Sequence, residues 1–359
     1  MKSKNVIIVD ENLPYLLNGL NHPVGGASVQ TSNWIHGFES NGFIPIIFSS
    51  VNLKNESCYN IEPSPKIKGF RRPFLLMKVA TMFFKVLVRY RPEFIYLSTP
   101  FWSNFIFILP ANLLGVKTIQ RISNDNLILS RARKKFNKIK YLFYVLSLKK
   151  ASILLCQNNY QKKHFKLEFP SKQILKLYNP FLFKSNDTAI EREYVAWIGL
   201  FQYQKNLPAL YKLAKNLPNI EFKIAGKAYE NIDGDTHDAI NLLRELNNVT
   251  FIGLLPRDKI SNFLSKAYCL LNTSRYEGFS NTYLEALSVG TPIVTRKKTD
   301  PDSIIEKYNL GYVEESYKDL PKAINKLVNE KFDYDYLHKY IINYHNPKSL
   351  TDKLINNKN

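Results

Sequence analysis

Hydrophobic residues recur along the chain in two alternating patterns. Short runs of apolar, β-branched and aromatic residues are each followed by a longer stretch with helical spacing. Because neighbouring parallel strands need crossover helices, this alternation is typical of an α/β fold with parallel sheets. In the first half we expect strands at 5–10, 43–49, 94–98, 116–121, 152–156 and 173–178, with helices near 27–41, 73–90, 101–114, 131–149 and 158–167.

The second half repeats this scheme, and we expect its strands at 194–199, 220–226, 249–253, 268–272 and 292–295. Beyond residue 318 the pattern is helical. Between the halves the periodicity is lost and polar residues collect, as in a linker. We therefore expect two Rossmann-like, doubly wound domains that face a cleft. The predicted boundaries are a first domain at 1–180, a linker at 181–193, a second domain at 194–340, and a helical tail at 341–359 that is placed to pack back on the first domain.

The composition fits two ordinary globular domains. The chain has 359 residues, of which 45% are hydrophobic and 13% aromatic, so a disordered or collagen-like protein is excluded. Cys58, Cys156 and Cys269 are odd in number and far apart, which excludes a disulfide framework and indicates a reducing compartment.

The net charge of +20 lies almost entirely in the first half. Residues 1–180 hold 26 Lys and Arg against 8 Asp and Glu, a balance of +18, whereas the remainder holds 24 against 22, a balance of +2. One basic half usually marks a surface that meets a polyanion, either nucleic acid or an anionic membrane. A lysine-rich composition without any such partner is the alternative.

Two windows carry most of this charge. Residues 63–92 contain eight Lys and Arg and residues 126–167 contain eleven, with no acidic residue in either window. The first window interleaves its charges with apolar side chains such as Phe74, Phe83 and Phe84, a composition typical of a helix at an anionic bilayer surface. We find no nucleic-acid recognition motif, so we favour a membrane partner and expect no nucleic acid. A buried helix flanked by solvated lysines is the alternative.

No apolar run near the start is long enough for a secretory leader, so we expect a cytoplasmic protein, peripheral on the inner face of the cell membrane. Residues 94–116 lack charge for 23 positions, a length that fits a transmembrane helix. Pro100 and Pro110 interrupt this stretch. We therefore interpret it as a buried strand followed by a buried helix.

The most informative motif lies at 272–294, where a predicted strand leads into a loop and then a helix. Glu277 stands in the loop and Glu285 on the helix, separated by seven residues. The backbone N–H groups of Ser280, Asn281 and Thr282 would open the helix, where the partial positive charge favours a diphosphate. The two carboxylates can accept hydrogen bonds from sugar hydroxyls, so the layout suits a nucleotide sugar. Taken singly, either glutamate would be interpreted as an ordinary solvated residue.

This segment closely resembles the E-x7-E signature of retaining glycosyltransferases with the GT-B fold, in particular the family 4 bacterial transferases that build surface polysaccharides. Upstream, Gly199 and Lys205 match the glycine and lysine that the family places after a strand. Leu200 stands where the family has an arginine, which leaves open which cation replaces it; Arg275 and Lys227 are candidates.

The resemblance implies roles for particular residues. Lys205 would stabilise the departing phosphate and Glu277 would orient the donor sugar, so we take both as catalytic. Glu285 would hold the ribose. The other expected donor-binding residues are Phe279, Ser280, Asn281, Thr282, and the glycine-rich loop at Gly25 and Gly26.

On the acceptor side, family members often carry a histidine after the fourth strand, whereas this chain has Asn124 and Asp125 there. These two could hold an acceptor hydroxyl, and a helix-capping role for Asp125 is equally open. We expect no metal and no cofactor, because no histidine or cysteine spacing fits a metal site and the nucleotide sugar is a substrate.

These observations predict a hexosyltransferase that moves a sugar from a nucleotide diphosphate to a saccharide acceptor with retention of anomeric configuration, and we expect the acceptor to be lipid-linked. A non-catalytic, polyanion- or membrane-binding protein that keeps the fold is the alternative, and the missing arginine favours it. The sequence does not indicate the base or sugar of the donor, the linkage formed or the oligomeric state.

Overall fold

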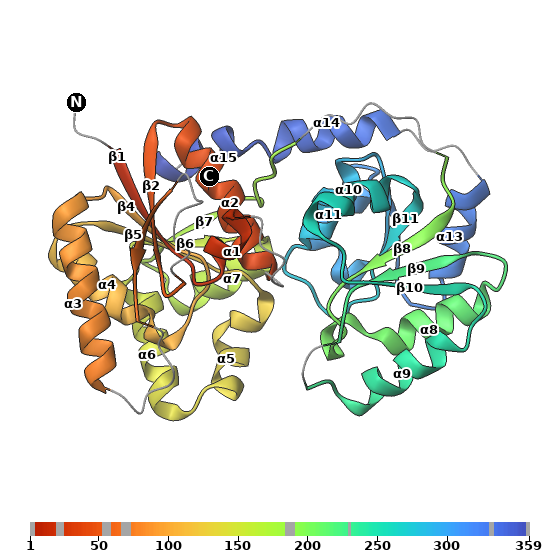
Figure 1. Ribbon diagram of the computed structural model, residues 1–359, viewed down its shortest axis with the longest axis horizontal. Coiled ribbons are helices and arrows are strands. Elements are labelled where there is room, and N and C mark those ends of the chain that lie inside the picture. The colour runs from red at the N-terminus through yellow and green to blue at the C-terminus, as the bar shows by residue number, and fades with distance from the viewer. Residues whose placement is uncertain are drawn as a thin grey trace. The chain divides into compact units, whose positions relative to one another are not determined.

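The computed structural model describes residues 4–18, 25–51, 59–65, 73–183, 191–228, 231–329 and 334–356. The chain forms two compact units (Figure 1): unit 1 comprises Met1–Leu182 and His345–Asn359, and unit 2 comprises Phe183–Tyr344. The chain thus passes between the units at 182/183 and at 344/345, a few residues beyond the boundaries expected at 180 and 340. Much of the predicted linker, residues 184–190, lies outside the described residues.

Unit 1 is built on a seven-stranded parallel sheet with the order β3-β2-β1-β4-β5-β6-β7. The six strands expected in this half are all present, with ends shifted by at most two residues. The edge strand β3 was not expected, because its sequence NIEP is short, polar and ends in proline. The strands are β1 (Lys4–Val9), β2 (Phe43–Ser49), β3 (Asn60–Pro63), β4 (Phe94–Leu97), β5 (Lys117–Arg121), β6 (Ile153–Cys156) and β7 (Gln173–Lys176).

Helices cover both faces of this sheet, so its strands are buried on both sides. Ile7 belongs to the core beneath α3, α4 and α6, and its neighbour Ile8 belongs to the core beneath α2 and α15. The α-helices are α1 (Leu13–Leu17), α2 (Gly26–Ser40), α3 (Pro73–Tyr90), α4 (Phe105–Leu113), α5 (Leu129–Lys135), α6 (Lys138–Lys150), α7 (Asn159–Glu168) and α15 (Pro347–Ile355), with short 3-10 turns η1 (Trp102–Asn104) and η2 (Asp125–Leu127).

Two expectations for unit 1 are wrong. The single helix expected at 131–149 is two helices, because Asn137 takes an extended conformation and its side chain accepts a hydrogen bond from the backbone N–H of Lys140, capping α6. Phe83, expected on the surface, is fully buried, because it shares the inward stripe of α3 with Leu76, Val79 and Leu87.

The uncharged stretch at 94–116 forms β4, η1 and α4, so the predicted strand followed by a helix is confirmed. That helix is buried on one side only, since Leu113 is 83% exposed. Among the residues that the structure describes, no helix combines the length and the hydrophobicity needed to cross a membrane. Cys156 and Cys269 are buried and free, and Cys58 lies outside the described residues.

The C-terminal helix α15 belongs to unit 1 and packs against α2. The helices approach closely at Gly37, where a Cβ atom would lie 2.1 Å from Thr351 Oγ1 and 2.6 Å from the carbonyl oxygen of Pro347. Just before α15, the ring Nδ1 of His345 lies 2.7 Å from the carbonyl oxygen of Asn179, and the Phe181 N–H donates to the His345 carbonyl. These bonds join the two chain segments where they enter unit 1.

Unit 2 holds a six-stranded parallel sheet with the order β10-β9-β8-β11-β12-β13. The five expected strands are present, and β13, which is short and only half-buried, was not expected. The strands are β8 (Tyr194–Ile198), β9 (Phe222–Ala225), β10 (Val249–Gly253), β11 (Ala267–Leu271), β12 (Ile293–Arg296) and β13 (Gly311–Glu314). The α-helices are α8 (Leu207–Asn216), α9 (Gly234–Arg244), α10 (Arg257–Ser265), α11 (Asn281–Leu287), α12 (Ile304–Lys307), α13 (Leu320–Asn329) and α14 (Tyr334–Tyr344).

The two sheets give the chain the α/β class that the sequence predicts. Each is parallel, wound on both faces and of the Rossmann type. In unit 2 the order changes direction between β8 and β11, and open sheets bind ligands beyond the carboxyl ends of such strands.

Candidate functional site

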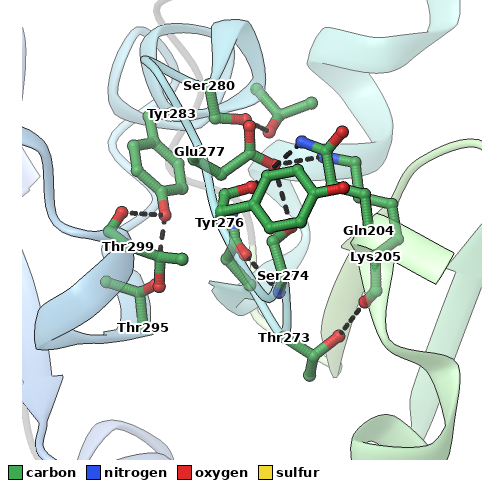
Figure 2. A network of polar contacts seen from close by, with 12 residues as sticks. Gln204, Lys205, Thr273, Ser274, Tyr276, Glu277, Ser280, Tyr283, Thr295 and Thr299 are labelled. Carbon is green, nitrogen blue, oxygen red and sulfur yellow. Dashed lines mark hydrogen bonds and ion pairs between the residues drawn. The ribbon is translucent and has the colours of Figure 1, made fainter. Parts of the chain in front are cut away.

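The site is built from two loops that follow neighbouring strands of unit 2 (Figure 2). One follows β8 and contains the turn η3 (Tyr203–Lys205); the other follows β11 and leads to α11. Thr273 connects them, because its hydroxyl donates to the carbonyl oxygen of Lys205 at 2.8 Å and accepts from Trp197 Nε1 at 3.0 Å. Gln204 adds a second connection to the carbonyl oxygen of Tyr276 at 3.0 Å.

Lys205 and Glu277 form an ion pair at the centre of these loops. The Lys205 Nζ lies 2.5 Å from Glu277 Oε1, and the side chains are only 18% and 8% exposed. The hydroxyl of Ser274 donates to the same carboxylate oxygen at 2.8 Å (Figure 2). A charge removed from water in this way needs a partner, so each group fixes the other. The two residues that the sequence predicts to be catalytic are therefore in contact.

Two glycines make room for this lysine. A Cβ atom on Gly199 would lie 3.4 Å from both Cδ and Cε of Lys205 and 3.1 Å from the ring of Trp197. Gly226 has a φ of +149°, and a Cβ atom there would lie 1.9 Å from the carbonyl oxygen of Gly199. Larger residues would displace the β8 loop, so the path of the Lys205 side chain depends on both glycines.

Glu285, the second glutamate of the motif, is also paired with a cation. Its Oε1 accepts from Arg257 Nη2 at 2.6 Å, and its side chain is 8% exposed against 48% for the arginine. Arg257 is the first residue of α10 and stands 28 positions before Glu285. Arg257 was not expected from the sequence, because no local spacing links residues that far apart.

The start of α11 lies where the sequence predicts it. The helix begins at Asn281 with Ser280 as its N-cap residue, and the hydroxyls of Ser280 and Thr282 are 2.7 Å apart. Phe279, just before the cap, is buried. Phe279 and Ser280 lie in the same loop as Glu277, and Asn281 and Thr282 form the first turn of α11, so the predicted donor-binding residues 279–282 closely follow Glu277 in sequence.

Tyr283 fixes α11 to the end of β12. Its hydroxyl contacts Thr295 Oγ1 at 3.1 Å and donates to the carbonyl oxygen of Thr299 at 3.0 Å (Figure 2). Burial raises the pKa of Tyr283 well above its ordinary value, so the hydroxyl keeps its proton. Nearby, burial raises the pKa of Asp300 to about 6, although its carboxylate accepts from the N–H groups of Ile305 and Glu306.

The two cations expected to replace the missing arginine, Arg275 and Lys227, have different surroundings. Leu200 leaves the position without a cation. The Arg275 guanidinium stacks 4.3 Å from the Tyr203 ring centre and donates to that residue's carbonyl oxygen, so η3 holds it. Lys227 is exposed. Arg296, not singled out from the sequence, donates to the carbonyl oxygen of Ser274 at 3.2 Å and supports the loop that carries Glu277.

Gly25 and Gly26 belong to unit 1. Gly25 is the extended N-cap residue of α2, and no atom lies within 4 Å of a Cβ placed on it. Asp10, at the end of β1, fixes the first turns of α2, because its carboxylate accepts from the hydroxyls of Ser28 at 2.7 Å and Thr31 at 2.9 Å. A buried carboxylate thus fixes the start of the helix that follows Gly25.

Asn124 and Asp125 also lie in unit 1, at the end of β5. The Asn124 side chain accepts from the Asn126 N–H at 2.9 Å and begins η2. Asp125 is buried, and its Oδ1 accepts from Asn158 at 3.2 Å and from Gln161 at 2.8 Å. The cap residue of η2 is therefore Asn124 and not Asp125, whose carboxylate instead joins η2 to the start of α7. Contact of either side chain with an acceptor stays a prediction.

The described part of the chain contains no cluster of side chains suited to binding a metal ion. No group of three or more His, Cys, Asp or Glu side chains is clustered there in a way that could hold a metal ion. The expectation that no metal or cofactor takes part stays a prediction.

The two Rossmann-like units define the structural class of the protein: it is an α/β protein with the GT-B fold. Residues 179–345 then match the family model described as glycosyl transferases group 1, a range that contains Lys205, Glu277 and Glu285. The match covers a little under half of the chain, and over this range the chain is similar to the group 1 glycosyltransferases.

Individual proteins are similar over different shares of the chain. An uncharacterised glycosyltransferase of Methanocaldococcus jannaschii is 26% identical over 297 residues, covering 75% of this chain and 67% of that protein. The lipopolysaccharide 1,6-galactosyltransferase of Escherichia coli is 29% identical over 109 residues, covering 24% of this chain and 30% of that protein. Among solved structures, Anabaena HepE in complex with UDP-glucose superposes with a TM-score of 0.74 at 14% identity and 98% coverage of both chains.

Proposed function

We propose that the protein transfers a sugar from a nucleotide diphosphate donor to a saccharide acceptor, with retention of anomeric configuration. The observation that carries the proposal is the buried contact between Lys205 and Glu277 at the carboxyl ends of β8 and β11. An ammonium group and a carboxylate held together there can bind two parts of one donor molecule. The cation suits the diphosphate, and the carboxylate suits the hydroxyls of the sugar.

In the proposed reaction, the bond between the sugar C1 and the diphosphate oxygen breaks while a bond forms between C1 and an acceptor oxygen. Negative charge grows on the departing phosphate. Lys205 stabilises this charge in the transition state more than in the ground state, which is the condition for accelerating the step. The acceptor proton passes to an oxygen of the leaving phosphate on the same face, so the proposal needs no protein base, metal or cofactor.

The free protein already holds Lys205 against Glu277, so donor binding must redirect the lysine from the carboxylate to the phosphate. The Glu277 carboxylate, released from the lysine, then accepts hydrogen bonds from the sugar hydroxyls. Ser274 keeps one of those oxygens in place throughout, because its hydroxyl donates to Oε1 independently of the lysine. The ion pair thus pre-positions both groups before the donor arrives.

Glu285 is proposed to hold the ribose hydroxyls of the donor. Its carboxylate is buried by α11 and α10 and has one cationic partner, Arg257. A carboxylate can accept several hydrogen bonds, so Glu285 has acceptor capacity for the ribose besides that partner. Ser280, Asn281 and Thr282 contribute backbone N–H groups beside the diphosphate, and Phe279 is proposed to contact the donor next to them.

The acceptor is proposed to be lipid-linked and the setting to be synthesis of a bacterial surface polysaccharide at the inner face of the membrane. The similarity to the Escherichia coli lipopolysaccharide galactosyltransferase supports this context, and the HepE complex with UDP-glucose supports a nucleotide sugar donor. Gly25 and Gly26 are proposed on the donor side, and Asn124 and Asp125 on the acceptor side.

The test is a panel of nucleotide sugars measured by thermal shift, followed by hydrolysis of the one that binds. A donor present at 100 times its dissociation constant adds about 2.7 kcal/mol to the free energy of unfolding. The expected result is one or two stabilising donors and slow release of nucleoside diphosphate from them. Binding without release, even with acceptors supplied, would instead support the non-catalytic alternative with the same fold.

A further inference from the structure

Three neighbouring helices of unit 1 expose large apolar side chains on their outer face. Helices α3, α4 and α6 cover one face of the sheet, with α4 in contact with both others (Figure 1). The stacked rings of Phe105 and Phe143, whose centres are 4.4 Å apart, join α4 to α6. We call the exposed side of these helices the three-helix face.

On α3 the exposed apolar residues follow helical spacing. Phe74 is 80% exposed, Met77 68%, Phe84 41% and Val88 49%, and all four lie opposite the buried stripe of the same helix. An ordinary surface helix is polar on that side. Helix α3 is thus apolar on both sides, with its outer side in water.

The neighbouring helices extend this face. On α4 Leu113 is 83% exposed and Leu109 38%; on α6 Ile139 is 57% exposed and Leu142 65%. Isolated exposed apolar residues are common, but a group of this size over three adjacent helices marks an interaction surface.

The charges of the three-helix face have one sign. Helix α3 carries three basic residues and α6 carries four, and none of the three helices contains an acidic residue. Arg89 is partly neutralised by Glu62 at 3.3 Å. The other six are lysines, namely Lys78, Lys85, Lys138, Lys140, Lys149 and Lys150.

We propose that the three-helix face docks on an anionic lipid bilayer, with Phe74, Leu113 and Leu142 inserted among the lipids and the lysines at the phosphate level. Apolar side chains beside lysines are what an anionic interface binds. A second copy of the chain is disfavoured, because it would bring two sets of lysines together without acidic partners. Nucleic acid would engage the lysines but would not account for the exposed leucines of α4 and α6.

This inference deepens the proposed lipid-linked acceptor, yet its surface differs from the one expected from the sequence. Phe83 and Leu87 lie in the core, whereas α4, which lies outside both basic windows, supplies Leu113. Lysines 66 and 68 and arginines 71 and 72 of the first window lie outside the described residues. Only the fold shows which apolar side chains are available to a membrane.

The experiment is co-sedimentation of the full chain with vesicles of phosphatidylcholine alone and of phosphatidylcholine mixed with phosphatidylglycerol. We expect binding to the anionic vesicles only. Salt should release part of the bound protein, because it screens the lysines but not the inserted side chains. Binding to neither kind of vesicle at low salt would overturn the proposal.

Two variants separate the contributions. A charge variant carries Lys78→Gln, Lys85→Gln and Lys149→Gln, and we expect it to lose roughly 100-fold in vesicle affinity. An apolar variant carries Phe74→Ser, Leu113→Ser and Leu142→Ser, and we expect its remaining binding to be fully released by salt. All six positions are exposed, so both variants should melt like the wild type.

A matched control carries Lys212→Gln, Lys298→Gln and Leu242→Ser, all on exposed positions of unit 2, and should bind vesicles like the wild type. Equal binding by the charge or apolar variant, or displacement of the vesicles by duplex DNA, would overturn the proposal. So would a dimer of the wild type that the apolar variant abolishes. Donor hydrolysis should be unchanged in all variants, so its absence from the wild type would count against the proposed function and not against docking.

Discussion

The Lys205 ammonium lies 2.5 Å from a Glu277 carboxylate oxygen, although 72 positions separate the two residues along the chain. Loops after two adjacent strands bring them together, and Thr273 and Gln204 fix the loops to each other. Both side chains are largely buried, so either one alone would leave a charge without compensation.

Replacing the lysine tests its proposed role. With Lys205→Ala we expect kcat to fall about 100-fold or more at saturating donor, because charge develops on the phosphate only as the bond breaks. Steady-state release of nucleoside diphosphate measures this, with Lys212→Ala on the exposed side of α8 as the control. Activity within a few-fold of the wild type would mean that another cation stabilises the departing phosphate.

The double variant Lys205→Ala with Glu277→Gln distinguishes stability from catalysis. The single variant leaves a buried carboxylate without its cation and should unfold at a lower temperature. Removing the carboxylate charge as well should recover much of the melting temperature but none of the activity. Recovery of both would mean that the lysine acts only on stability.

Glu285→Ala should act on donor binding. A ribose contact is made equally in the ground state and the transition state, so we expect a higher KM for the donor with kcat changed only a few-fold. Initial rates over a range of donor concentrations separate the two constants. A large fall in kcat at unchanged KM would be inconsistent with a ribose contact.

Gly37→Ala should weaken the packing of α15 on α2. The added methyl group would meet the Pro347 backbone, which cannot rotate away as a flexible side chain would. We expect the free energy of unfolding to drop by about 1–3 kcal/mol, as in other overpacked cores. Gly234→Ala is the control, because nothing lies within 4 Å of its Cβ position, and its denaturant midpoint should stay at or above that of the wild type.

His345 should make unit 1 sensitive to mild acid. Burial lowers its pKa to about 4, against an ordinary value of 6.5. Between these values the unfolded chain binds the proton and the folded chain does not, so stability falls as the pH drops through this window, by an amount of order 3 kcal/mol. Denaturant titrations at several pH values measure the slope, and His345→Gln should flatten it.

Asp300 should change the pH dependence of stability in the opposite direction to His345. Its raised pKa of about 6 means that the folded chain binds the proton more tightly, so this group adds stability at low pH that is lost as the pH rises through 6. Asp300→Asn should therefore steepen the acid loss caused by His345. If both variants shifted the profile in the same direction, one of the two assignments would be wrong.

The sequence predicted those features that local patterns encode. Most of the eleven expected strands are short runs rich in apolar, β-branched or aromatic residues, and Glu277 and Glu285 stand within one short motif. Strands β3 and β13 were missed because their four-residue sequences, NIEP and GYVE, show no apolar run. The partner of Glu285 was missed for a different reason: Arg257 meets it only once α10 packs on α11.

Two errors had signals that could have corrected them. Asn137 is a good N-cap residue in the middle of the predicted helix at 131–149, and such a residue usually begins a new helix. The positions 76, 79, 83 and 87 follow one helical stripe, which would have placed Phe83 inside and Phe84 outside. The exposure of Leu113 had no such signal, because α4 is apolar all round.

The order in which the chain is synthesised gives the position of α15 a further consequence. Unit 2 is one continuous segment, Phe183–Tyr344, whereas unit 1 also needs His345–Asn359. During synthesis the surface of α2 that receives α15 therefore stays uncovered until every residue of unit 2 has been made. Most of unit 1 is synthesised before unit 2, but unit 1 can complete its packing only after α15 has been made.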